Sequence, residues 1–117
     1  LWLQSPAPSA LCYVFADETL YPNPAGFWVG TVGNTAYYVH LAMGPNVIPL
    51  ADPYNTFGTS LTNAMTDANG NWSISFSIPN DPTLQGLTFY SEAFVEDPGL
   101  LPNGLFHQSN VLTVTIQ

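Results

Sequence analysis

The chain has 117 residues, of which eight are Asp or Glu and none is Lys or Arg, so its formal net charge at pH 7 is -8. Proteins that bind nucleic acid or anionic lipid use Lys and Arg to do so, and the composition therefore predicts neither partner. A phosphate-binding loop and a Schiff base are excluded as well, because both need a lysine. Covalent polymerisation of pilus subunits also consumes a lysine amine, so any polymer of this chain must be held by non-covalent contacts.

The hydrophobic content and the length predict one domain with a packed core. Hydrophobic residues make up 46% of the chain, which is too much for a disordered protein, and a chain of this size can bury enough surface to fold without disulfides. The lone Cys12 forms no internal disulfide and fits either redox compartment. No apolar run approaches the roughly 18 residues that a membrane helix needs.

The first ten residues are predicted to form an N-terminal arm, followed by a single domain over residues 11–117. The chain starts without Met, so it is either a processed product or a fragment. Ser5 to Ala10 are similar to the end of a signal peptide, but residues 1–10 are taken as part of the mature protein, and we expect export. The prolines between Ser5 and Pro8 favour an extended conformation. The apolar residues Leu1, Trp2 and Leu3 have no partner nearby in sequence, which leaves two arrangements open. They dock on a neighbouring subunit, or they fold back as an edge strand of their own domain.

Four segments in the first half are predicted as strands. Each is rich in aromatic and β-branched residues and is bounded by Pro, Asn or Gly. They are residues 11–16, 26–32, 36–43 and 47–50.

The strictest alternation of apolar and polar residues lies in residues 72–78, which predicts a strand with one buried face. The apolar face consists of Trp72, Ile74, Phe76 and Ile78. Just before this strand, the pair Asn69-Gly70 tolerates the positive φ angles of a tight turn. Residues 59–65 and 72–78 are therefore predicted to form a β-hairpin.

Two further strands are predicted at residues 87–95 and 111–116, separated by Pro- and Gly-containing loops at 97–99 and 102–104. Their inward residues are predicted to be Leu87, Phe89, Ala93, Val95, Leu112, Val114 and Ile116. The total is about eight short strands at intervals of roughly 10–14 residues. The fold class predicted is all-β, an antiparallel Greek-key (immunoglobulin-like) β-sandwich of seven to nine strands.

A set of short motifs follows one another in the second half of the chain. They are a turn with Asp67 and Gly70, a strand that ends in Ile78-Pro79, the run Leu84-Gln85-Gly86-Leu87-Thr88-Phe89-Tyr90, the pair Asp97-Pro98, and the closing run Ser109-Asn110-Val111-Leu112-Thr113-Val114-Thr115-Ile116. Over about residues 44–117 this set resembles a C-terminal domain common in exported proteins of planctomycetes and related bacteria. Glu92 stands where that pattern has Gln. The resemblance implies secretion and a β-sandwich, and it brings no catalytic motif with it.

The sequence predicts no catalytic, cofactor-binding or transition-metal residues. His40 and His107 lack the spacing of metal ligands. Ser109, His107 and Asp97 can be written as a nucleophile, base and orienting acid, but these residue types occur together in almost every chain. Calcium is the one ion left open, because the adjacent carboxylates of Asp17-Glu18 or of Glu96-Asp97 repel each other and a divalent ion would relieve them.

Two functions remain after an enzyme is set aside for lack of a motif. The first is a secreted, non-enzymatic structural module that self-assembles non-covalently into an extracellular filament or surface layer, with Leu1, Trp2 and Leu3 as the assembly residues. Its partners would be copies of itself, as a homo-oligomer or polymer. The alternative is a carbohydrate-binding module of an exported protein, which would need two or three aromatic residues facing solvent to bind a glycan. We predict the first.

Overall fold

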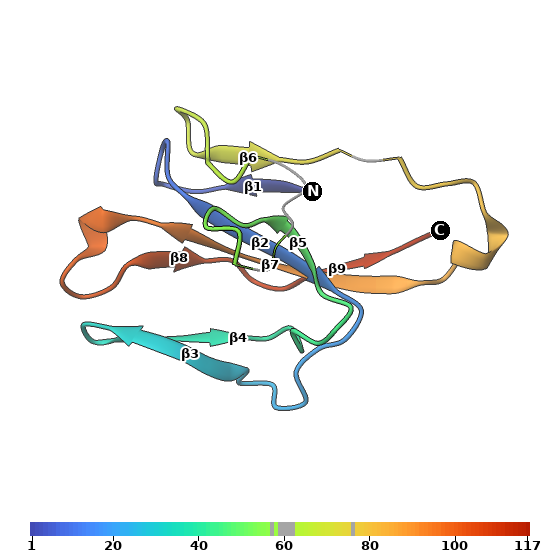
Figure 1. Cartoon of the computed structure of the whole chain (residues 1–117), viewed down its shortest axis with the longest axis horizontal. Helices are drawn as coiled ribbons and strands as arrows, with labels where there is room; N and C mark the ends of the chain where they lie inside the picture. Colours follow the sequence, from blue (N-terminus) through green and yellow to red (C-terminus); the bar gives the residue numbers. More distant parts are fainter. Residues whose placement is uncertain (57, 59–62, 76) are drawn as a thin grey trace.

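The computed structural model describes residues 1–56, 58, 63–75 and 77–117. Within these residues the chain forms nine antiparallel strands and two short 3-10 helices, Pro82–Leu84 and Pro98–Leu100. The strands make one five-stranded sheet and two separate two-stranded ribbons (Figure 1). The predicted all-β sandwich is confirmed, with a strand number at the upper end of the predicted range.

The five-stranded sheet is built around β7 (Thr88–Glu96), the longest strand. On one side β7 pairs with β2 (Cys12–Asp17), which pairs in turn with β5 (Ile48–Ala51). On its other side β7 pairs first with β9 (Leu112–Thr115) and then with β8 (Phe106–Gln108). The pairing register moves by one residue between β8 and β9, so these two strands form one edge that is interrupted by a bulge.

The two ribbons cover parts of opposite faces of this sheet. The first pairs β1 (Trp2–Gln4) with β6 (Asn71–Ser73), and the second pairs β3 (Phe27–Val32) with β4 (Thr35–Val39). Figure 1 shows the two ribbons on either side of the labels for β2, β7 and β8. Because strand side chains alternate between faces, a central strand under both ribbons is buried on both sides. This explains the unbroken burial of residues 91–95 in β7.

The two faces of the sheet have different cores. The face toward β1 and β6 holds small side chains packed around Trp72, including Val14, Ala93 and Val95. The face toward β3 and β4 is aromatic, and Phe106 makes edge-to-face contacts with both Tyr37 and Phe94. Such ring pairs add about 0.5–1.5 kcal/mol each to the burial of their surface.

The sequence predictions for individual strands are confirmed in part. Strands occur within or across the predicted segments 11–16, 26–32, 36–43, 47–50, 87–95 and 111–116. Strand β1 corresponds to one of the two arrangements left open for the N-terminal residues, and β8 was not predicted. The predicted turn before Trp72 is present, and Gly70 has a φ of 80° there.

The predicted hairpin partner of residues 72–78 is wrong in the part of the chain that the structure describes. Strand β6 pairs with β1, and Met65 bridges to Leu11 instead. Residues 59–62 and Phe76, which belonged to the same prediction, lie outside the described residues. The turn is therefore present, but the segments before and after it do not pair with each other. Strand β1 pairs with the segment after the turn instead.

Three residues predicted to face the core are largely exposed. They are Ile78, Leu87 and Leu112, with exposed fractions of 46%, 51% and 45%. Leu87 and Leu112 lie at the β7–β9 end of the sheet, which extends beyond both ribbons in Figure 1. A period-two pattern gives the two faces of a strand, but a face is buried only where another layer covers it.

Candidate functional site

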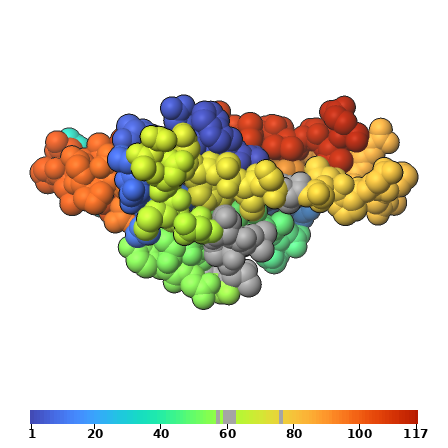
Figure 2. All heavy atoms as spheres, turned by 90° about the horizontal axis from the view of Figure 1, so that it is seen from above, coloured from blue at the N-terminus to red at the C-terminus, as the bar shows by residue number. Residues whose placement is uncertain are grey.

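The N-terminal arm lies on its own chain as the edge of a ribbon. The N-terminal amine of Leu1 donates to the carbonyl of Ile74 at 3.1 Å, and the amide of Ile74 donates back to the carbonyl of Leu1 at 3.0 Å. Leu1 and Leu3 pack against the core around Trp72, whereas Trp2 is 65% exposed. Figure 2 shows the N-terminal residues next to the segment that contains β6. The sequence left open whether these residues dock on a neighbouring subunit or fold back as an edge strand of their own domain. In the structure they fold back.

The residues between β1 and β2 are held by the turn that precedes β6. The hydroxyl of Thr66 donates to the carbonyl of Ala7 at 2.9 Å and accepts from the amide of Ala10 at 2.9 Å. The amide of Ser5 donates to the carbonyl of Gly70 at 2.9 Å. Ser5, Ala7 and Ala10 are all buried, so the predicted arm of residues 1–10 packs on the domain of residues 11–117.

One edge of β1 has its backbone turned away from β6. In an antiparallel pair, hydrogen-bonded residues alternate with residues whose N–H and C=O groups point outward. Leu1 and Ser5 bond to the β6 side, so by this alternation Trp2 and Gln4 present their backbone groups on the opposite side. That side of β1 is an edge able to pair with another extended segment.

This edge borders a groove of about 510 Å³. One wall is β1, and the other is the bulged edge between β8 and β9. The floor is the face of the main sheet next to β1. It includes Val14, Ala93 and Val95, which are buried, and the exposed Leu112 lies beside them. Among the groove residues, Glu92 has the single carboxylate, and that residue is only 1% exposed.

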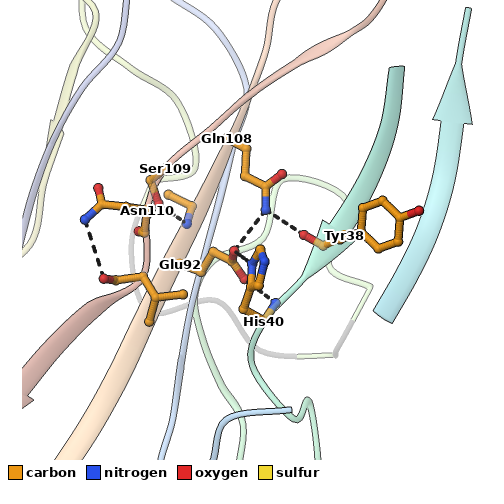
Figure 3. A network of polar contacts seen from close by, with 8 residues as sticks. Tyr38, His40, Glu92, Gln108, Ser109 and Asn110 are labelled. Atoms are coloured by element: carbon orange, nitrogen blue, oxygen red, sulfur yellow. Dashed lines mark hydrogen bonds and ion pairs between the residues drawn. The ribbon is translucent and has the colours of Figure 1, made fainter. Parts of the chain in front are cut away.

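The buried carboxylate of Glu92 joins the main sheet to β4 through a polar network whose other members are partly exposed (Figure 3). Its Oε1 accepts from the amide of His40 at 2.8 Å, and its Oε2 contacts Nδ1 of His40 at 2.6 Å. The amide nitrogen Nε2 of Gln108 donates to Oε2 of Glu92 at 2.9 Å and to the carbonyl of Tyr38 at 2.5 Å. The chain has no Lys or Arg to pair with this buried acid. The backbone amide of His40, its ring and the side chain of Gln108 contact the carboxylate instead.

The residues written as a catalytic triad are brought together only in part. Nε2 of His107 contacts Oδ2 of Asp97 at 2.7 Å. The hydrogen bond from the His107 side chain, followed by that from the Gly99 amide, lowers the pKa of Asp97 below its ordinary value. The hydroxyl of Ser109, however, donates to the carbonyl of Asn110 at 2.8 Å and accepts from the amide of Ala93 at 2.9 Å. Ser109 thus bridges the bulge in the β8–β9 edge, and its proton is not directed at His107.

The carboxylates considered for calcium have different surroundings. Glu18 accepts from the side chain of Asn46 at 2.5 Å, and Oδ1 of Asp17 accepts from the amide of Thr19 at 3.2 Å. Oδ2 of Asp17 is buried and has no hydrogen-bond partner among the described residues. Within those residues, three or more His, Cys, Asp or Glu side chains do not gather at any place. Calcium binding stays a prediction.

Alkali is expected to destabilise the protein between about pH 9 and 12. Burial raises the pKa of the Cys12 thiol from 9.0 to about 11, and burial, with Tyr54, Glu96 and Asp52 nearby, raises the pKa of Tyr13 from 10.0 to about 12. Both pKa shifts mean that the folded protein favours the neutral thiol and the neutral phenol. The free energy of unfolding is therefore highest below the unfolded-state pKa values, and it falls as pH rises through the folded-state values. Denaturant titrations across this range should show the decline, and Cys12→Ala should remove the thiol's share. A constant free energy of unfolding over these pH values would contradict it.

Comparison of the chain with protein-family models, curated proteins and solved structures gave no match. The resemblance to an exported planctomycete domain is therefore still a prediction. Among the described residues, the structure contains no helix long and apolar enough to cross a bilayer.

Proposed function

We propose that the protein is a secreted, non-enzymatic structural module that self-associates through non-covalent contacts into an extracellular filament or surface layer. The observation that carries this proposal is the outward edge of β1 beside the groove. Trp2 is exposed there, and the backbone groups of Trp2 and Gln4 are turned toward the space in which another strand would pair.

Charge supports the same place for contact between copies. Each copy carries eight acidic residues and no Lys or Arg, so two copies repel each other over most of their surfaces. The groove is different, because its one carboxylate is buried and bonded to His40 and Gln108. An extended segment of a second copy that pairs with β1 would cover the exposed side chains of Trp2 and Leu112 without meeting an exposed acid in the groove. If that segment is not β1 itself, the contact is heterologous, and it repeats into a filament wherever the rotation between copies does not close a ring.

The proposal is tested by substitutions at β1 that leave its bonds to β6 in place. Trp2→Glu puts a charge on the rim of the groove, and Gln4→Pro removes the outward amide, a known way to block a sheet edge. Both are expected to shift the protein from oligomers to monomers in sedimentation velocity and to remove ordered assemblies from negative-stain images. Deletion of residues 1–8 is less informative, because it also removes Leu1 and Leu3 from the core.

The matched control is Tyr54→Glu, which replaces an aromatic residue that is 64% exposed and makes the same change in charge. Tyr54 does not line the groove, so this variant should assemble as the wild type does. Circular dichroism should show that each variant is folded. A wild-type protein that stays monomeric at all concentrations, or equal assembly by Trp2→Glu and Tyr54→Glu, would overturn the proposal.

A further inference from the structure

The β3–β4 ribbon carries a pair of exposed aromatic rings on its outward face. Trp28 and Tyr38 are direct cross-strand partners, and they are 59% and 40% exposed. Val29, which is 50% exposed, lies at the irregularity in the register between Trp28 and Gly30. On the inward face of β4, Tyr37 and Val39 are buried in the aromatic core. The outward rings are therefore not needed to close this core.

Several contacts hold the two rings on a fixed base. The indole Nε1 of Trp28 donates to the hydroxyl of Thr31 at 2.9 Å, which restrains the orientation of the ring. The backbone carbonyl of Tyr38 accepts from Gln108, whose side chain also bonds to Glu92 (Figure 3). Because the two side chains are already restrained, little conformational entropy of the protein would be lost when a ligand stacks on their rings.

The ribbon lies in an uncharged part of an acidic chain. No Asp, Glu, Lys or Arg occurs between residues 19 and 51. An anionic ligand would find no cation there, and a cationic ligand would be attracted instead to the carboxylates elsewhere. The ligand that suits this face is neutral, and it has an apolar surface for the rings with hydrogen-bonding groups for the hydroxyl of Thr31 and the amide of Asn34.

We propose that the outward face of β3–β4, centred on Trp28 and Tyr38, binds neutral oligosaccharides. A pyranose ring offers an apolar C–H face for stacking on an aromatic ring, and its hydroxyl groups bond to neighbouring polar side chains. A second copy of the chain is a poorer occupant, because a stable protein interface takes about 20–30 residues on each side and this patch consists of three large exposed side chains. The site is independent of the β1 edge, which belongs to the other ribbon.

The experiment is isothermal titration of the full chain with neutral hexasaccharides of β-1,4-linked glucose, xylose and N-acetylglucosamine. At least one of these is expected to bind, and an oligogalacturonate of equal length is expected not to. Trp28→Ala and Tyr38→Ala should each lower the association constant by about tenfold. Tyr54→Ala, which removes an aromatic residue of similar exposure outside both this ribbon and the groove beside β1, should leave it unchanged.

Both ring variants remove exposed side chains, and circular dichroism is expected to show that they fold. Three results would overturn the proposal. They are a failure of all three neutral sugars to bind at millimolar concentration, an equal loss of affinity in Tyr54→Ala, and a change of oligomeric state in Trp28→Ala without any sugar binding. The last result would instead make the ribbon a protein contact.

Discussion

Replacing Glu92 with alanine is expected to lower the free energy of unfolding by about 2–4 kcal/mol. Glu92 is 1% exposed and accepts the amide of His40, contacts its ring and accepts the side chain of Gln108. Alanine would remove all of these acceptors and leave a cavity in place of the carboxylate, although His40 and Gln108 are partly exposed and can bond to water instead. Because the network joins β7 and β8 to β4, its loss should also loosen the β3–β4 ribbon. Denaturant titration followed by circular dichroism measures the change.

The matched variant is Glu92→Gln, which keeps the shape and one acceptor oxygen. That oxygen can still accept from the backbone amide of His40, and the new side-chain NH2 group can donate to Nδ1 of His40 when the ring is protonated at Nε2. Gln108 then loses its acceptor, so the expected cost is about 1–2 kcal/mol. If Glu92→Ala and Glu92→Gln cost the same small amount, the network contributes no stability of its own.

Most of the main sheet could be predicted because its strands are marked by local composition. Residues 87–95 and 11–16 are apolar runs between turn residues, and they form β7 and β2. The turn before β6 was also predictable, since only a residue tolerant of positive φ suits the place that Gly70 occupies. These features depend on a few neighbouring residues, which is the range over which a sequence pattern carries information.

The pairing of β1 with β6 could not be predicted in the same way. Leu1 and Ile74 meet across 73 positions in the sequence, and no periodicity within either segment specifies the other. The rule that joins the strands on both sides of an Asn-Gly turn therefore led to the wrong partner. The signal available was the unexplained run Leu1-Trp2-Leu3, whose apolar residues had to be buried by some surface.

The polar network and the exposed ring pair were also missed. Glu92 is a lone carboxylate within an apolar strand, which is the pattern of a buried acid, yet its partner His40 is 52 positions away. Trp28 and Tyr38 are exposed because β3 and β4 form an outer ribbon, and a sequence of alternating aromatic and apolar residues does not say which face is covered. In both cases the missing information is the placement of layers, which depends on contacts distant in sequence.

Replacing Gly70 with alanine is expected to cost about 2–4 kcal/mol and to displace the N-terminal arm. Gly70 has a φ of 80°, and a Cβ at this position would lie 2.0 Å from the carbonyl oxygen of Ser5. The left-handed backbone accounts for about 1–2 kcal/mol of the expected cost. The rest comes from the clash, which can be relieved only if Ser5 moves away and gives up its hydrogen bond to Gly70. Leu1 and Leu3 should then leave the core, and the fluorescence of Trp72 should shift toward that of an exposed indole.

Gly86→Ala separates the two causes, because Gly86 has a φ of 84° and no atom of the described residues lies within 4 Å of the added carbon. This control carries the backbone cost alone, about 1–2 kcal/mol. A larger loss of stability in Gly70→Ala than in Gly86→Ala would therefore measure how firmly the arm sits on its own turn. Equal losses, with unchanged Trp72 fluorescence, would mean that Ser5 is not seated against Gly70 in solution. The arm would then be available to a neighbouring subunit, and assembly would proceed by exchange of β1 between copies instead of by pairing along its outward edge.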